Sequence, residues 1–116
     1  MKALMVLVLM WPVLSLASTF ECTENAAQFI APVTKVEKVE NGCFVKVNLT
    51  SENGYFNSST LCPIIWEDVH YGQGIWVDKD DKIKCDDFLE GLFISGIIIQ
   101  KVDEDFFRFD YVVLHK

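Results

Sequence analysis

Four cysteines, spread through a chain of only 116 residues, constrain the fold more than any other feature of the sequence. The gaps between them are 21, 19 and 23 residues, whereas zinc ligands come in close pairs and redox-active thiols in C-x-x-C motifs. An even number of widely spaced cysteines in a small exported chain is typical of a disulfide framework. We therefore expect two structural disulfides, formed by Cys22, Cys43, Cys62 and Cys85. We expect no metal ion or other cofactor.

The first 17 residues have the layout of a secretory signal peptide. Lys2 gives a positive start, residues 4–16 form an apolar run, and Ala17 ends a small-residue cleavage site. The run of 13 residues is shorter than the roughly 20 needed to cross a bilayer as a helix. We expect residues 1–17 to be removed and residues 18–116 to form one domain in the periplasm or outside the cell. The short leader favours a bacterial periplasm.

Acidic residues outnumber basic ones in the expected mature chain. Its 17 Asp and Glu against 9 Lys and Arg give a net charge of −8, and 12 of the acids lie between residues 67 and 110. Affinity for nucleic acid comes mainly from clustered Lys and Arg, so the composition argues against a nucleic-acid partner. An acidic surface instead favours a basic protein as partner.

Alternating side chains and turn signals indicate mainly antiparallel β-structure. Apolar and polar residues alternate from Cys43 to Thr50, as in a strand with one buried face. Asn41-Gly42 and Asn53-Gly54 are strong hairpin signals, because Asn and Gly adopt the positive φ that a two-residue turn needs. The expected strands cover residues 33–40, 43–50, 55–62, 75–77, 83–85, 97–102 and 106–114.

Two short helices are expected beside these strands. Thr23 can cap a helix over residues 23–31, and Asp86 can cap one or two further turns; residues 66–74 have the composition of a loop. The fold class is therefore α+β, mainly antiparallel β: a sheet of five to seven strands or an OB-like barrel, with one or two short helices and two disulfides. In the last strand one face is expected to be lined by Phe107, Phe109, Tyr111 and Val113.

Three disulfide pairings are possible, and local pairing favours one of them. If residues 43–50 and 55–62 form a hairpin, Cys43 lies opposite Cys62 across the ladder. That arrangement leaves Cys22 to pair with Cys85. The pairing, like the oligomeric state, is otherwise left open by the sequence.

One histidine has candidate catalytic neighbours. Glu67, Asp68 and His70 lie within four residues of one another, and carboxylates beside an imidazole are groups that a hydrolase can use for acid–base chemistry. A single E-x-x-H in a loop is weak evidence, because carboxylate di-metal sites use two such motifs on paired helices. A small hydrolase is therefore the third hypothesis, behind two non-enzymatic ones.

A run of aromatic and acidic residues is the candidate partner-binding surface. Aromatic side chains beside charges are typical of protein-binding hot spots. The first hypothesis is therefore an exported, non-enzymatic inhibitor or immunity-type protein that occludes a cationic secreted hydrolase or toxin. The second is an oligosaccharide- or peptide-binding barrel in which aromatic rings stack on the ligand. The candidate residues are Trp66, Glu67, Asp68, Tyr71, Trp76, Asp78, Asp80 and Asp81.

Two N-glycosylation sequons begin at Asn48 and Asn57. They matter only if the source is eukaryotic. The strand alternation places Asn48 on the polar face.

Overall fold

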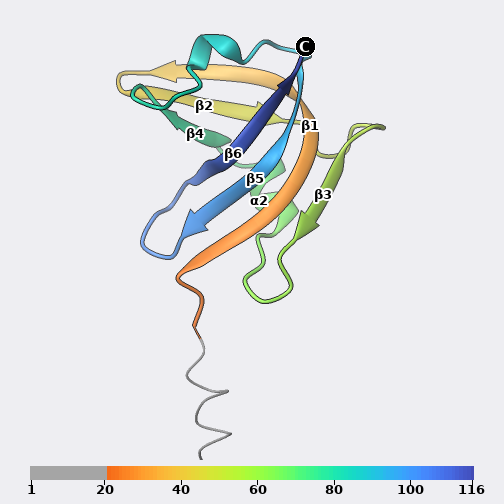
Figure 1. Cartoon of the computed structure of the whole chain (residues 1–116), viewed down its shortest axis with the longest axis vertical. Coiled ribbons are helices and arrows are strands. Elements are labelled where there is room, and N and C mark those ends of the chain that lie inside the picture. The colour runs from red at the N-terminus through yellow and green to blue at the C-terminus, as the bar shows by residue number, and fades with distance from the viewer. Residues whose placement is uncertain (1–20) are drawn as a thin grey trace, which may run out of the picture.

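Six strands wrap around one apolar core in the computed structural model, which describes residues 21–116 (Figure 1). The predicted leader, residues 1–17, lies outside the described residues. Five of the six strand pairings are antiparallel, so the predicted mainly antiparallel α+β fold class is confirmed. The elements are β1 (Glu24–Val39), β2 (Gly42–Val47), β3 (Tyr55–Ser58), α2 (Trp66–His70), β4 (Ile75–Asp78), η1 (Cys85–Asp87), β5 (Phe93–Lys101) and β6 (Phe107–His115).

Five of the strands close into an OB-like barrel. The sheet order is β2-β4-β6-β5-β1-β3, and an additional β2–β1 pairing joins the two ends of the five-stranded part. The 16-residue strand β1 makes this closure possible, because its first half pairs with β5 and its second half with β2. Only β4 and β6 run parallel, and β3 lies outside the ring against β1.

The first half of β1 corrects the prediction of a helix over residues 23–31. Ala27, Phe29, Ala31 and Val33 are all buried, so the apolar residues follow the two-residue period of a strand. Pro32 is tolerated because it makes the last pair with β5, just before an irregular register where β1 turns onto β2. Burial against the core therefore overrides the local helical signal.

The hairpin between β1 and β2 forms one residue earlier than the Asn-Gly signal predicts. Val39 pairs with Gly42, which leaves Glu40 and Asn41 as the turn. No non-glycine residue among those described has positive φ, and Gly42 is not among the glycines that do. The glycine is needed for another reason: a Cβ at Gly42 would lie 2.1 Å from the Val77 carbonyl oxygen and 2.9 Å from the Trp76 ring.

Both disulfides differ from the pairing that the sequence favoured. The structure joins Cys22 to Cys62 and Cys43 to Cys85, over 40 and 42 residues of chain. The expected hairpin between 43–50 and 55–62 does not form, because β3 pairs with β1 at Ala27–Ile30 instead of with β2. Two disulfides are typical of an oxidising compartment.

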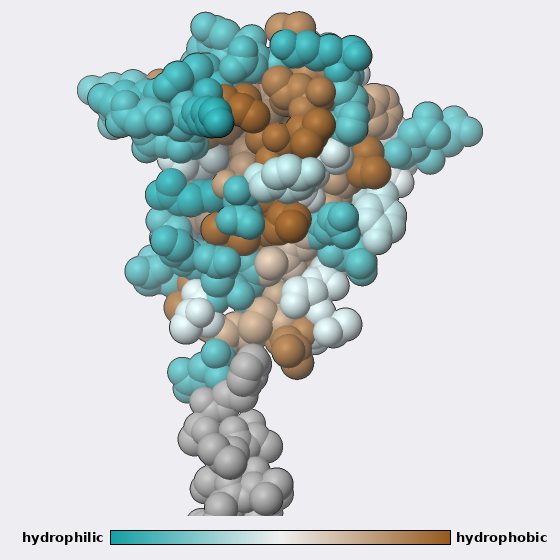
Figure 2. Space-filling model, viewed as in Figure 1, coloured by the Kyte–Doolittle hydropathy of each residue, from teal (hydrophilic) through white to brown (hydrophobic). Residues whose placement is uncertain are grey.

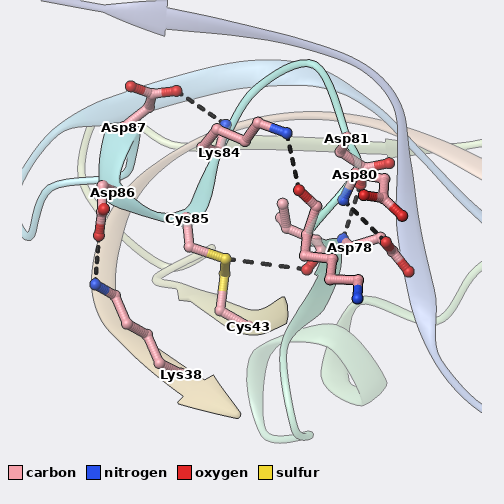
Figure 3. The surroundings of a disulfide bond; sticks show 11 residues. Lys38, Cys43, Asp78, Asp80, Asp81, Lys84, Cys85, Asp86 and Asp87 are labelled. Atoms are coloured by element: carbon pink, nitrogen blue, oxygen red, sulfur yellow. Dashed lines mark hydrogen bonds and ion pairs between the residues drawn. A yellow bond between two sulfur atoms is a disulfide. The ribbon is translucent and has the colours of Figure 1, made fainter. Parts of the chain in front are cut away.

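The segment between β4 and β5 contains neither the strand expected at 83–85 nor a helix from Asp86. Only the 3-10 turn η1 forms, and it is tied to β2 by the Cys43–Cys85 disulfide and to β1 by the Lys38–Asp86 ion pair (Figure 3). Further along, Val33 of β1 exchanges backbone hydrogen bonds with Gly91 and Leu92. These contacts hold the segment across the end of the barrel and compete with helix formation.

Strand β6 changes its inward face at Asp110. Tyr111 pairs with Ile97 and Phe109 with Ile98, so Asp110 is an extra residue, as in a β-bulge. Phe107 and Phe109 pack against the core, but beyond the bulge Val112 and Leu114 face inward. The prediction that Tyr111 and Val113 share one face with Phe107 and Phe109 is therefore wrong, and their exposed fractions are 57% and 37%.

Candidate functional site

Three aromatic side chains form a continuous strip on the outside of the barrel. Phe44 of β2 and Trp76 of β4 have ring centroids 4.9 Å apart, and Trp76 lies 6.1 Å from Phe106, which precedes β6. The chain neighbours of Phe44 and Trp76 are buried, so strand alternation places both rings on the outer face. We call Phe44, Trp76 and Phe106 the aromatic strip.

Arg108 holds one end of the aromatic strip. Its guanidinium lies 4.8 Å from the Phe106 ring centroid, within cation–π range. The same group donates to both carboxylate oxygens of Glu104, at 3.0 and 3.3 Å. Two contacts on one guanidinium therefore fix the β5–β6 loop and the orientation of Phe106.

Phe106 also lines a pocket of about 290 Å³. It lies where the α2–β4 connection, the end of β5 and the β5–β6 loop meet. Asp68 and Asp105 line it, and no basic residue within residues 21–116 forms an ion pair with either carboxylate. We call this cavity the acidic pocket; its lining residues are Asp68, Gly72, Gln73, Gly74, Gln100, Asp105, Phe106 and Phe107.

Helix α2 replaces the loop expected at residues 66–74, and it carries a second aromatic cluster. The His70 ring lies 5.6 Å from Trp66 and makes an edge contact with Tyr71 at 4.6 Å. The Nδ1 atom of His70 accepts a hydrogen bond from the Leu49 amide at 3.2 Å, which anchors the helix to the end of β2. His70 therefore has a structural role, while Glu67 and Asp68 are exposed on the same helix.

The carboxylates after β4 shape their own loop. Asp78 accepts a hydrogen bond from the Asp80 amide, and Asp81 accepts one from the Asp78 amide, at 3.0 and 2.9 Å. Lys84 reaches back to the Lys79 carbonyl oxygen at 2.8 Å (Figure 3). Three lysines between residues 78 and 84 balance the three aspartates. This loop is therefore less acidic than the number of aspartates indicates.

The eight predicted site residues do not form one surface. Asp68 and Trp76 come together, because both adjoin Phe106. Trp66 and Tyr71 belong to the α2 cluster, and Glu67 is exposed on the same helix. Asp78, Asp80 and Asp81 belong to the loop after β4.

Several residues of the site were missed at the sequence level. Phe44 was detectable, because it is an aromatic residue on the polar face of an alternating strand. Phe106, Asp105 and Gln100 had no such signal, since only the pairing of β5 with β6 and of β4 with β6 brings their part of the chain beside Trp76.

No group of three or more His, Cys, Asp or Glu within residues 21–116 is arranged to hold a metal ion. Over the same residues, no helix is both long and apolar enough to span a membrane. The fold and the site together define a disulfide-linked, OB-like barrel with an aromatic strip beside an acidic pocket. No protein-family model, curated protein or solved structure matches the chain.

Proposed function

We propose that the mature chain is an exported, non-enzymatic binding protein whose partner is a basic protein. In its most specific form it is a periplasmic inhibitor or immunity-type protein that occludes a cationic secreted hydrolase or toxin. The aromatic strip would form the centre of the interface, where partly exposed aromatic rings contribute most of the binding energy. The excess of acidic residues would accelerate association with a cationic partner.

The observation that carries this proposal is the position of Phe106 between the aromatic strip and the acidic pocket. Asp68 and Asp105 place two carboxylates without ion-pair partners beside an aromatic ring. An inserted Lys or Arg side chain would meet opposite charge from the carboxylates and a cation–π contact from Phe106. A volume of about 290 Å³ is sufficient for one such side chain.

A neutral oligosaccharide is the second candidate ligand. Gln73 and Gln100 add amide groups to the two carboxylates in the pocket, and such groups hydrogen-bond sugar hydroxyls while aromatic rings stack on the sugar faces. In OB-folds the face of the second and third barrel strands binds oligonucleotides and oligosaccharides, and β2 and β4 occupy those positions here. This support is an analogy between folds.

Two variants test the proposal on the mature, oxidised chain. Binding to basic proteins of the source's own envelope or secretome is measured with the wild type, with Trp76→Ala, and with Asp68→Asn combined with Asp105→Asn. Each variant is expected to weaken binding at least about tenfold, as truncation of an interface hot spot does. Glu37→Gln combined with Glu90→Gln is the matched control, because it removes the same number of charges from exposed positions outside the pocket.

Two results would contradict this proposal: the first removes the protein partner, and the second removes the strip and the pocket as its binding site. One is saturable binding to a neutral glycan, lost in Trp76→Ala and unchanged between low and high salt. The other is full retention of protein binding in both site variants.

A further inference from the structure

The barrel is open between β4 and β6 beyond the aromatic strip. These strands pair at only two positions, Ile75 with Phe107 and Trp76 with Arg108. The rest of β6 passes in front of β4 and diverges from it (Figure 1). Within residues 21–116, no strand pairs with the β4-facing edge of β6 from Phe109 to His115. Alternate backbone N–H and C=O groups of β6 are therefore available for pairing along this edge.

An apolar cavity of about 650 Å³ lies in this opening. Phe88 and Phe109 stack against each other inside it, with ring centroids 5.5 Å apart and planes 9° from parallel. Figure 2 shows apolar surface bordered by polar groups on this side of the molecule. We call the opening the β4–β6 cleft; its lining residues are Val77, Asp81, Lys82, Ile83, Phe88, Phe109, Asp110, Tyr111 and Val112.

The charges at the rim of the cleft favour a basic ligand. Asp110 and Asp81 line the rim together with one cation, Lys82, and Asp81 also accepts the hydrogen bond from the Asp78 amide, so Asp110 is the main charge at the rim. Neither carboxylate forms an ion pair with another described residue. The mature chain carries 17 acids against 9 bases, so a second copy of the chain would be repelled, whereas a positively charged segment would be attracted.

We propose that the β4–β6 cleft binds an extended peptide segment of a protein partner, which pairs with the free edge of β6 and packs an apolar side chain against Ile83 and the stacked rings of Phe88 and Phe109. Such β-strand addition takes affinity from main-chain hydrogen bonds and specificity from pockets for alternate side chains. A Lys or Arg next to the inserted residue would face Asp110. The proposal rests on the proposed function to the extent that both require a protein partner.

The cleft and the aromatic strip form adjoining parts of one surface. Trp76 belongs to the strip and makes, with Arg108, the last pair before the strands diverge. A partner loop on the strip can therefore continue into the cleft as an extended strand. The strip would hold the folded surface of the partner, and the cleft would hold the segment that follows.

The probes are ten-residue peptides in which Lys and Val alternate around a central Leu or Phe. They are titrated into the mature, oxidised, 15N-labelled chain, followed by amide chemical shifts and hydrogen exchange. We expect saturable binding, slowed exchange at alternate amides of residues 110–115, and shifts around Phe88. A peptide with Pro at every second position, which lacks the donors for pairing, should bind at least about tenfold more weakly.

Two variants report on the cleft without removing core side chains. Ile83→Trp fills part of the cavity and should weaken peptide binding at least about tenfold. Leu61→Trp is the matched control, because Leu61 is highly exposed and lies outside the cleft. Asp110→Asn should weaken binding of the Lys-containing peptides only. Thermal unfolding of each variant, compared with the wild type, establishes that the fold is retained.

Several outcomes would overturn the proposal. The first is the absence of chemical-shift changes at 1 mM peptide, and the second is chemical-shift changes confined to the aromatic strip. The third is peptide binding that is unchanged in a folded Ile83→Trp variant. The fourth is slowed exchange of residues 110–115 that self-association causes without peptide. A small apolar molecule that fills the cavity more tightly than any peptide would also overturn it. Partner binding that needs Trp76 but ignores Ile83→Trp would leave the proposed function standing and remove only the cleft.

Discussion

Gly42 shows how a single position couples the fold to the candidate site. It begins β2 directly beneath the indole of Trp76, and the space for a side chain is already occupied by that ring and by the Val77 carbonyl oxygen. The absence of a Cβ lets the β2 and β4 backbones approach and leaves room for the Trp76 ring beside Gly42. The stability of the barrel and the position of the aromatic strip therefore depend on the same glycine.

We predict that Gly42→Ala destabilises the protein by about 1–3 kcal/mol, the usual cost of overpacking a well-filled site. Part of this cost comes from the Trp76 ring, so Gly42→Ala should cost about 0.5–1 kcal/mol less in a Trp76→Ala background. Urea unfolding of the four proteins in this cycle measures both numbers. An equal cost in the two backgrounds would show that the ring does not fill the space above Gly42.

At the level of elements, the prediction from sequence succeeded where the signal was local. The β1–β2 hairpin, the alternation of β2 and the turn before β6 depend on neighbouring residues, and all three are present. The helix expected at 23–31 and the 43–62 pairing failed because β1 forms pairs with three other strands. Local sequence patterns do not contain these long-range contacts. The alternation of Ala27, Phe29, Ala31 and Val33 nevertheless indicated a strand.

The two disulfides allow a prediction about these elements. They close loops of 40 and 42 residues, and the chain-entropy estimate gives about 4 kcal/mol for each. Their burial differs: Cys43 is fully buried in the core, whereas Cys22 and Cys62 are only partly buried. Replacing Cys43 and Cys85 by Ala should therefore destabilise the protein more than replacing Cys22 and Cys62, because a cavity term adds to the lost cross-link.

Urea unfolding of the two double variants measures this difference. If the Cys22→Ala/Cys62→Ala variant folds, its β4–β6 region should be unchanged, because the lost Cys22–Cys62 disulfide lies at the opposite end of β1. A larger decrease in the free energy of unfolding on replacing Cys22 and Cys62 would show that anchoring the start of β1 stabilises the protein more than filling the core around Cys43.

At the scale of the whole molecule, the site is assembled from segments far apart in the chain. Phe44, Trp76 and Phe106 come from three different elements, and only barrel closure brings them together. Composition predicts an acidic surface, and local hydrogen bonding and ion pairing decide which acids are available. In the loop after β4, the carboxylates of Asp78 and Asp81 accept backbone hydrogen bonds, whereas no basic residue within residues 21–116 pairs with Asp68 or Asp105 in the acidic pocket.

The difference between acidic residues in the pocket and acidic residues elsewhere on the surface leads to a prediction about the kinetics of partner binding. The net charge of −8 on residues 18–116 acts at long range, and salt shortens that range from about 30 Å at 0.01 M to about 8 Å at 0.15 M. The association rate should therefore fall about tenfold or more over this interval. The dissociation rate should change little with salt, but it should rise in the Asp68→Asn/Asp105→Asn variant, where the contact itself is lost.

Stopped-flow or surface measurements on the same partner separate the two effects. Glu37→Gln combined with Glu90→Gln removes two exposed charges outside the pocket, and it should slow association without changing dissociation. If association is independent of salt while the pocket variant still dissociates faster, the partner is recognised by contact alone and long-range charge has no role. If the pocket variant changes only association, Asp68 and Asp105 act as remote charges, and the acidic pocket does not hold a partner side chain.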